Sequence, residues 1–184
     1  MRYCLTVCIV ICCCSVDNCV PLLIQQIINI SHIFNRSWAE YKVGFNDSRG
    51  NYRIGNDLLS QLTMTGRYKL KFDLQARYSR LWYYAEYSTF MVLSESSNYR
   101  VIASGASGNA GYDAFSYHNG AMFSTFDRDN DAQTSINCAA TWGYGYWYKD
   151  CTHCRSNCFN NNFHWTGLPG GSALRSARGW LQCK

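Results

Sequence analysis

Hydrophobic and polar residues alternate most regularly in the middle of the chain. Between residues 67 and 74, apolar side chains fall at every second position, which predicts a β-strand with one buried face. Residues 82–93 are rich in aromatic and β-branched side chains and are predicted to form a long strand. Residues 99–103 are its expected partner across the turn at 94–98. The aromatic positions of this hairpin are therefore expected in the core rather than on a binding surface.

The pattern is weaker on either side of this hairpin. Two short helices are predicted, at residues 37–43 and at residues 56–62, the second with Asn56 as its N-terminal cap. Residues 22–34 are apolar without a clean period. Residues 104–111 are glycine-rich but lack the Gly-Lys-Ser/Thr ending of a phosphate-binding loop, so a flexible surface connection is expected there. From this point to the C-terminus the sequence shows little periodicity.

The composition excludes two classes of partner. The 184 residues carry a net charge of only +5, without a block of Lys and Arg, so nucleic acid is not an expected partner. No basic amphipathic segment indicates a membrane surface. Of the eleven cysteines, five lie before residue 15 and six remain. That even number is typical of a protein from an oxidising compartment.

The first residues are typical of a secretory signal peptide, which we place at residues 1–18. Met1 and Arg2 form a short basic start, mostly apolar residues follow, and small or polar residues around Ser15 offer a cleavage site. The apolar run is shorter than the roughly 20 residues that a membrane-spanning helix needs. The chain is therefore predicted to be secreted and extracellular, without stable membrane insertion; an uncleaved anchor and a misassigned start are the alternatives. Three glycosylation sequons are compatible with secretion, at Asn29, Asn35 and Asn46.

Three aspartates alternate with other residues in an irregular segment, at Asp127, Asp129 and Asp131. Carboxylates so close together repel one another unless a cation lies between them, and an oxygen-preferring ion such as Ca2+ is the natural candidate. The segment is not an EF-hand, because Ala132 stands where that loop requires glycine and Cys138 where it requires a bidentate glutamate. The alternative is a solvated acidic turn.

The same region carries a resemblance to a known family. It reads FSTFDRDNDAQTSINCA, preceded by SGNAGYDAFSYHNG and followed by GYWYKDC. Further matching stretches are WAEYKVGF at residues 38–45, GND at residues 55–57 and YAEYSTF at residues 84–90. These motifs resemble a fibrinogen-related domain, from about residue 34 to about residue 175. The resemblance implies an α+β fold: a twisted, mainly antiparallel sheet with short helices, followed by a loop-rich calcium-binding subdomain.

The resemblance also implies where calcium binds. In the family, the second and third aspartates supply carboxylates and two nearby backbone carbonyls complete the protein ligands. Carried over, these are Asp129 and Asp131 with the carbonyls of Gln133 and Ser135. Asp127 would then serve as a turn or capping residue. With two carboxylates we expect a dissociation constant on the order of 0.1–1 mM, which suits a structural ion in an extracellular module.

The family's disulfide corresponds to Cys138 and Cys151. Four further cysteines have no assigned counterpart in the family and their pairing stays open: Cys19, Cys154, Cys158 and Cys183. Together with two nearby histidines, His153 and His164, the group from Cys151 to Cys158 is compatible with a zinc cluster. In a secreted chain, additional disulfides are favoured over zinc.

A ligand edge is implied beside the second cysteine of the disulfide. In ficolins and tachylectin-type lectins, the peptide bond into this cysteine is cis and a following histidine helps to line a pocket for acetyl groups. Carried over, the edge consists of Asp150, Cys151, Thr152 and His153. This sequence departs from the family there, because Thr152 precedes the histidine and the segment that forms the far wall of the pocket is missing before Trp165.

The beginning of the family's domain is not found in this sequence. A disulfide-bonded first segment and a strand bearing Gly-Gly-Trp are absent, so a partial domain is expected at residues 34–184. The sheet is then expected to lack an inner strand, which would leave unpaired backbone edges.

The leading hypothesis is a secreted, calcium-dependent recognition protein that binds acetylated carbohydrate on microbial surfaces in innate defence, as the resemblance to ficolins implies. The alternative is an extracellular ligand or matrix module that binds protein, as in angiopoietins and tenascins, or a truncated copy without retained binding. No catalytic set is found around His118, His153 and His164, so the protein is predicted not to be an enzyme. His118 is expected in a turn or in the core.

Overall fold

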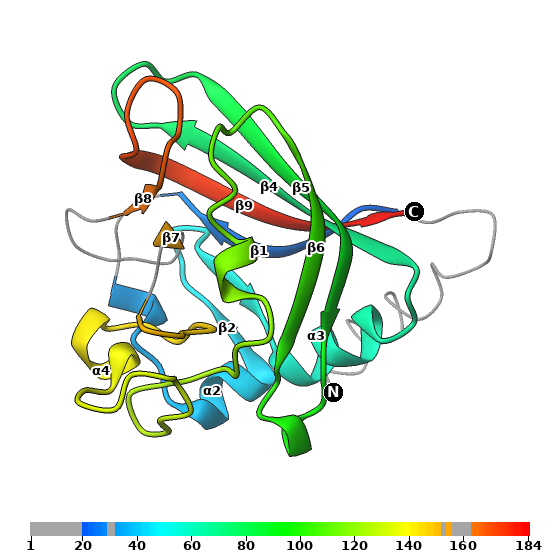
Figure 1. The fold of residues 1–184 in the computed structure, drawn as a ribbon, viewed down its shortest axis with the longest axis vertical. Helices are drawn as coiled ribbons and strands as arrows, with labels where there is room; N and C mark the ends of the chain where they lie inside the picture. Colours follow the sequence, from blue (N-terminus) through cyan, green and yellow to red (C-terminus); the bar gives the residue numbers. More distant parts are fainter. Residues whose placement is uncertain (1–19, 29–31, 152–153, 156–162) are drawn as a thin grey trace.

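The computed structural model describes residues 20–28, 32–151, 154–155 and 163–184. Its main element is a seven-stranded sheet with the order β2-β3-β1-β9-β4-β5-β6, in which all neighbours are antiparallel (Figure 1). The strands are β1 (Leu22–Ile27), β2 (Gly44–Asn46), β3 (Tyr52–Ile54), β4 (Tyr68–Ala76), β5 (Trp82–Val92), β6 (Val101–Gly108) and β9 (Leu174–Cys183). Two short strands, β7 (Cys154–Arg155) and β8 (His164–Trp165), pair separately. The predicted α+β fold with a mainly antiparallel sheet is confirmed. The predicted signal peptide lies outside the described residues.

The helices are short. They are α2 (Trp38–Val43), α3 (Asn56–Thr63) and α4 (Cys138–Trp142), with 3-10 turns η1 (His32–Phe34), η2 (Glu95–Ser97) and η3 (Ser116–His118). Ser37 starts α2 through a reciprocal capping box with Glu40. The predicted cap of α3 is wrong: Gly55 occupies the cap position, and Oδ1 of Asn56 instead accepts a hydrogen bond from Arg53.

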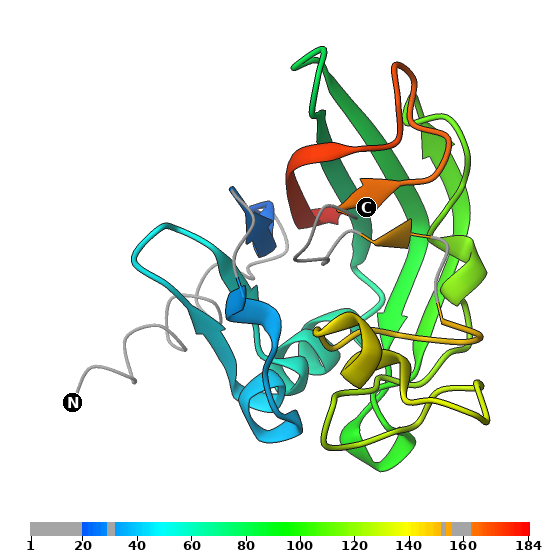
Figure 2. The ribbon, with the colours of Figure 1, turned by 90° about the vertical axis from the view of Figure 1, so that its left-hand side faces the viewer.

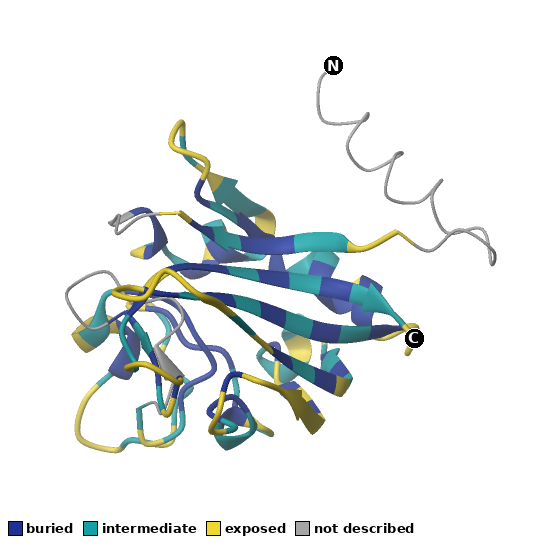
Figure 3. Ribbon diagram, turned by 90° about the horizontal axis from the view of Figure 1, so that it is seen from above, coloured by how far each residue is buried: buried dark blue, intermediate teal, exposed yellow. Residues whose placement is uncertain are grey.

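The central hairpin forms as its alternation predicts. Residues of β4 alternate between buried and partly buried along the whole strand, and Figure 3 shows the same banding on the neighbouring strands. The apolar face of β4 contributes Leu70, Phe72 and Leu74 to the core. Strand β5 pairs with β4 on one side and with β6 on the other. The expectation that these aromatic positions belong to the core is confirmed for Tyr87 and Phe90 and is wrong for Trp82 and Tyr84, which are exposed at the start of β5.

The expectation of a missing inner strand is wrong. Strand β1 lies inside the sheet, because it pairs with β3 on one side and with β9 on the other. Strand β1 is difficult to recognise in the sequence because its pairing with β9 shifts register between Leu23 and Gln25. Such an irregularity breaks the two-residue alternation by which a strand is recognised. In addition, Gln25 is buried although it is polar.

Two segments predicted to be irregular are strands. Residues 104–108 continue β6 instead of forming a flexible connection, since their backbone pairs with β5 as far as Gly108. Their small, exposed side chains give no alternating pattern. Near the C-terminus, β9 is a central strand of ten residues between β1 and β4. Its pairing with β4 shifts at Gln75 and Ala76, which obscures its period.

Residues 109–151 form the loop-rich part of the fold, which packs beside the sheet (Figure 2). Aromatic rings join the two layers. The ring of Phe115 lies 5.2 Å, between centroids, from those of Phe72 and Tyr87 in the sheet. Within the loop-rich part, Phe123 lies 5.2 Å from Trp147. These buried rings place the candidate metal loop against a rigid core.

Candidate functional site

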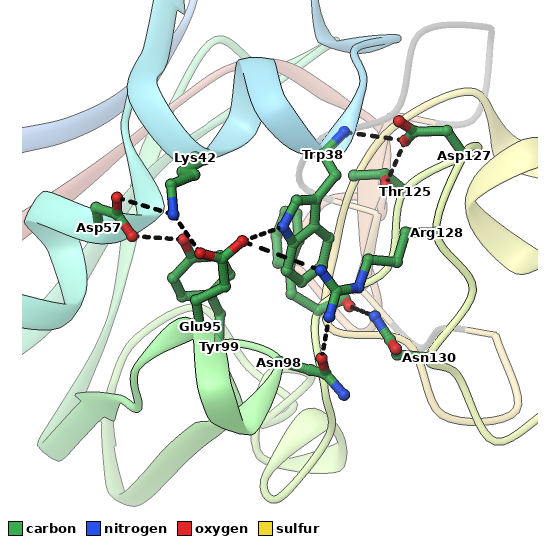
Figure 4. Close-up of polar contacts among 11 residues, drawn as sticks. Trp38, Lys42, Asp57, Glu95, Asn98, Tyr99, Thr125, Asp127, Arg128 and Asn130 are labelled. Carbon is green, nitrogen blue, oxygen red and sulfur yellow. Dashed lines mark hydrogen bonds and ion pairs between the residues drawn. The ribbon is translucent and has the colours of Figure 1, made fainter.

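Asp127 fixes the start of the candidate metal loop, residues 127–138. Its Oδ1 accepts a hydrogen bond from the backbone N of Trp38 at 2.9 Å and another from the hydroxyl of Thr125 at 2.7 Å (Figure 4). Because Trp38 is the first residue of α2, Asp127 ties the loop to the positive end of that helix. These contacts agree with the turn or capping role that the family resemblance implies for Asp127.

Asp129 and Asp131 lie together in the loop. The backbone N of Asp131 donates to Oδ1 of Asp129 at 3.2 Å. The two oxygens of Asp131 accept backbone hydrogen bonds from Gln133 at 2.8 Å and from Cys138 at 2.9 Å. Burial raises the pKa of the Asp131 carboxyl group, these two N–H donors oppose the shift, and the adjacent Asp129 raises the pKa further. Two close carboxylates with lone pairs left over suit a hard cation.

Gln133 and Ser135 complete the predicted ligand set. Oε1 of Gln133 accepts hydrogen bonds from the backbone N of Ser135 at 3.1 Å and from its hydroxyl at 2.9 Å. Within the described residues, neither backbone carbonyl accepts a hydrogen bond. Two free carbonyl oxygens beside two carboxylates fit the oxygen chemistry of calcium. No group of three or more His, Cys, Asp or Glu side chains forms a metal site in the described part of the chain, so an ion here requires these carbonyls.

A disulfide joins Cys138 to Cys151, with a Cα–Cα distance of 5.3 Å. Cys138 is the first residue of α4, and Asn137 caps that helix by accepting a hydrogen bond from the backbone N of Ala140. The bridge therefore anchors the end of the metal loop to the segment that carries Asp150. Cys183 is also disulfide-bonded.

The metal loop and the predicted ligand edge touch directly. Nε2 of Gln133 donates to Oδ1 of the exposed Asp150 at 2.7 Å. Nearby, the hydroxyl of Tyr117 reaches the carbonyl of Asp150 at 3.4 Å, and Nζ of Lys149 lies 5.7 Å from the centroid of the Tyr117 ring. The ligand edge in the described structure consists of Tyr117, Gln133, Lys149 and Asp150, and it shares Asp150 with the edge predicted at residues 150–153.

Part of the predicted edge is not described. Thr152 and His153 lie outside the described residues. Cys151 has a left-handed φ of +50°, and no cis peptide bond occurs in the described part of the chain, so the bond into Cys151 differs from the cis bond of the acetyl-binding lectins. The sequence offered no signal for Tyr117 or Lys149, because their proximity to Asp150 depends on the folding of the loops.

His118 lies in the core, which is one of the two locations predicted for it, a turn or the core. Its side chain is fully buried, and Nδ1 lies 2.7 Å from the carbonyl oxygen of Trp147. The ring also packs edge-on against Tyr146, with the centroids 4.9 Å apart. His118 therefore supports the loops behind the ligand edge.

Comparison with known proteins identifies this arrangement. Residues 5–171 match the family described as fibrinogen beta and gamma chains, C-terminal globular domain. The chain belongs to this family. The fibrinogen-like globe domain of human ANGPTL2 superposes with a TM-score of 0.80 at 32% identity, covering 89% of this chain and 80% of that one. Domains of this fibrinogen family commonly bind calcium and are non-enzymatic binding modules.

Two further relatives extend the comparison of this fibrinogen-like domain. Mouse tenascin is 38% identical over 143 residues, which cover 73% of this chain but only 7% of tenascin. Lamprey fibrin D-dimer, solved in complex with the peptide Gly-His-Arg-Pro-amide, superposes with a TM-score of 0.74 at 26% identity, covering 90% of this chain and 62% of that one. The chain thus spans less than a tenth of the length of tenascin. Tenascin and angiopoietin-related proteins are secreted, extracellular proteins. Among the described residues, no helix has the length and apolarity to cross a membrane.

Proposed function

We propose that this fibrinogen-like domain is an extracellular recognition module that binds a protein partner at the ligand edge, and that calcium in the adjacent loop holds the edge in shape. The observation that carries the proposal is the 2.7 Å hydrogen bond from Gln133 to Asp150. Through it, any ion that orders the carbonyl of Gln133 also orders the exposed carboxylate beside it. The ion would have a structural role, with Asp129, Asp131 and the carbonyls of Gln133 and Ser135 as ligands.

Two considerations favour a protein partner over acetylated carbohydrate. Relatives of this chain include tenascins and angiopoietin-related proteins, and the lamprey relative was solved with a short peptide that contains an arginine. An exposed carboxylate such as that of Asp150 suits a cationic peptide group. The carbohydrate hypothesis rests on the pattern at residues 150–153, where this sequence departs from the lectins.

Direct binding measurements distinguish the two ligand classes. The secreted chain is titrated with Gly-His-Arg-Pro-amide by calorimetry and is passed over N-acetylglucosamine resin, each in millimolar Ca2+ and again in EDTA. We expect calcium-dependent binding of the peptide, weakened about tenfold in Asp150→Asn through loss of a charge-assisted contact. The matched control is Glu86→Gln, which removes a carboxylate paired with Lys69 on the sheet and should leave peptide binding unchanged.

Each outcome has a defined meaning. Retention on the resin with elution by free acetylated sugar, and no peptide binding, would replace the proposal with the lectin function. Peptide binding that is equal in the wild type and in Asp150→Asn would remove the ligand edge from the proposal. A folded chain that binds neither probe would contradict recognition of these two ligand classes at this edge.

A further inference from the structure

Arg53 is a cation in the interior of the domain. It belongs to β3, and only 2% of its surface is exposed. Nη2 donates to Oδ1 of Asn56 at 3.0 Å, and the guanidinium carbon lies 5.6 Å from the centroid of the Trp147 ring. Burial lowers the pKa of Arg53 to about 10, with partial compensation from Tyr41, Tyr52 and Tyr146. At neutral pH the group therefore remains charged.

No carboxylate of the described chain neutralises this charge. Of the twelve acidic residues in the sequence, all but Asp17 are described, and none of these eleven forms an ion pair with Arg53. A buried cation without a counter-charge is strongly destabilising. A compensating negative group is therefore expected near Arg53.

Two hydrogen-bond donors at the same place also have no acceptor among the described residues. They are Nε of Arg53 and Nδ2 of Asn56. The orientation of the Asn56 amide is fixed, because Arg53 offers only donors and Oδ1 must face it. Asn56 is also the first residue of α3, where the helix dipole is positive. Of these two residues only Arg53 lines the cavity described next, so its fixed positive charge and its Nε donor are what select an acceptor with negative charge.

Arg53 lines a small cavity between the sheet and the aromatic loops. Most of the other walls are apolar, among them Phe72, Phe90 and Phe115, and Gln25 and Tyr146 also line the cavity. The cavity has a volume of about 20 Å³, above the roughly 10–15 Å³ that one buried water molecule requires. The space accepts a single atomic ion, whereas a carboxylate-bearing organic molecule is too large.

We propose that the cavity beside Arg53 binds a halide-sized monovalent anion, which is chloride in an extracellular setting. The anion accepts a hydrogen bond from Nε of Arg53 and neutralises the guanidinium inside the core. This site is separate from the calcium loop and contributes to the stability of the domain rather than to recognition. Binding is therefore expected to depend on the size of the anion and to be independent of calcium.

Thermal unfolding in matched salts tests this proposal. Melting temperatures are measured in sodium chloride, sodium bromide and sodium gluconate at equal ionic strength and at constant calcium. When chloride is tenfold above its dissociation constant, we expect a melting temperature about 3–6 °C higher than in gluconate. Arg53→Met, which replaces the charge with an apolar side chain of similar length, should show no difference between the salts. Arg49→Met, at an exposed turn, should keep the wild-type difference.

A crystallographic measurement on the wild type tests the proposal even if Arg53→Met does not fold. Anomalous diffraction from wild-type crystals grown in bromide should show a peak within hydrogen-bond distance of Nε of Arg53. The proposal is overturned if the wild type melts at the same temperature in all three salts, if Arg53→Met keeps the halide effect, or if the cavity holds only a water molecule in the bromide crystals.

Discussion

The indole Nε1 of Trp38 lies 2.7 Å from Oε1 of Glu95, and this hydrogen bond joins α2 to the turn between β5 and β6. The same carboxylate forms an ion pair with Lys42, and the guanidinium of Arg128 stacks 3.9 Å from the centroid of the Trp38 ring. Since the backbone of Trp38 also binds Asp127, the start of the metal loop depends on this polar cluster (Figure 4).

The ion pairs of Glu95 should contribute little stability, with a characteristic pH dependence. The hydrogen bond from Lys42 is the main reason that the pKa of Glu95 is lowered, followed by the bond from Trp38. A lowered pKa means that the contribution is present above the unfolded pKa of about 4.3 and is lost as the pH falls through the folded value. At neutral pH, Glu95→Gln should lower the free energy of unfolding by no more than about 1 kcal/mol, because the pair is partly exposed.

Urea unfolding of the wild type and Glu95→Gln between pH 7 and about pH 3 checks this sign. The difference between the two proteins should stay constant at neutral pH and shrink in acid below the ordinary glutamate pKa. A difference that grows in acid would contradict the assignment. High salt should also reduce the difference at pH 7, because it screens exposed charges.

Asp129→Ala should abolish the effect of calcium on stability. In the wild type, calcium at tenfold its dissociation constant should stabilise the fold by about 1.4 kcal/mol and raise the melting temperature by about 3–6 °C. The matched control is Asp127→Ala, which loses the bonds to Trp38 and Thr125. It should melt lower both in EDTA and in calcium while keeping the shift. An unchanged shift in Asp129→Ala would place the ion elsewhere.

Replacing the Cys138–Cys151 disulfide with two serines should lower the free energy of unfolding by about 3 kcal/mol. The bond closes a loop between residues 13 positions apart, and without it the unfolded chain regains the conformational entropy of that loop. The double variant should also bind calcium more weakly, since the backbone N of Cys138 holds Asp131. Urea unfolding and calcium titration of the double variant measure the two effects. A variant as stable as the wild type would show that the loop is held by its packing alone.

Tyr41→Phe should destabilise the domain by about 1–3 kcal/mol. The buried hydroxyl donates to the carbonyl of Phe34 at 2.8 Å and accepts from the backbone N of Gly145 at 3.1 Å, so one group connects α2 to the loop before the ligand edge. Urea unfolding gives the cost. Tyr78→Phe, at an exposed position, serves as the control and should be neutral; equal stability of the two variants would contradict the role of Tyr41.

By itself, the sequence determined the elements whose signal is local. The alternation in β4 and the aromatic run in β5 predict strands because each residue's face follows from its own position. The capping box of Ser37 and Glu40 is equally local. The aspartate pattern at residues 127–131 and the pair Cys138 and Cys151 are also local in sequence, so the family resemblance could be recognised without knowing how the chain packs.

Only the tertiary structure decided how distant segments combine. Strands β1 and β9 occupy the middle of the sheet although register shifts interrupt their alternation, because a strand's burial is set by the neighbours on both of its sides. The bonds from Gln133 to Asp150 and from Trp38 to Glu95 join residues far apart along the chain, and no spacing predicts them. The burial of Arg53 is the clearest case. No local pattern around Arg53 indicates burial, and only the packing of the aromatic loops over β3 places its charge in the core.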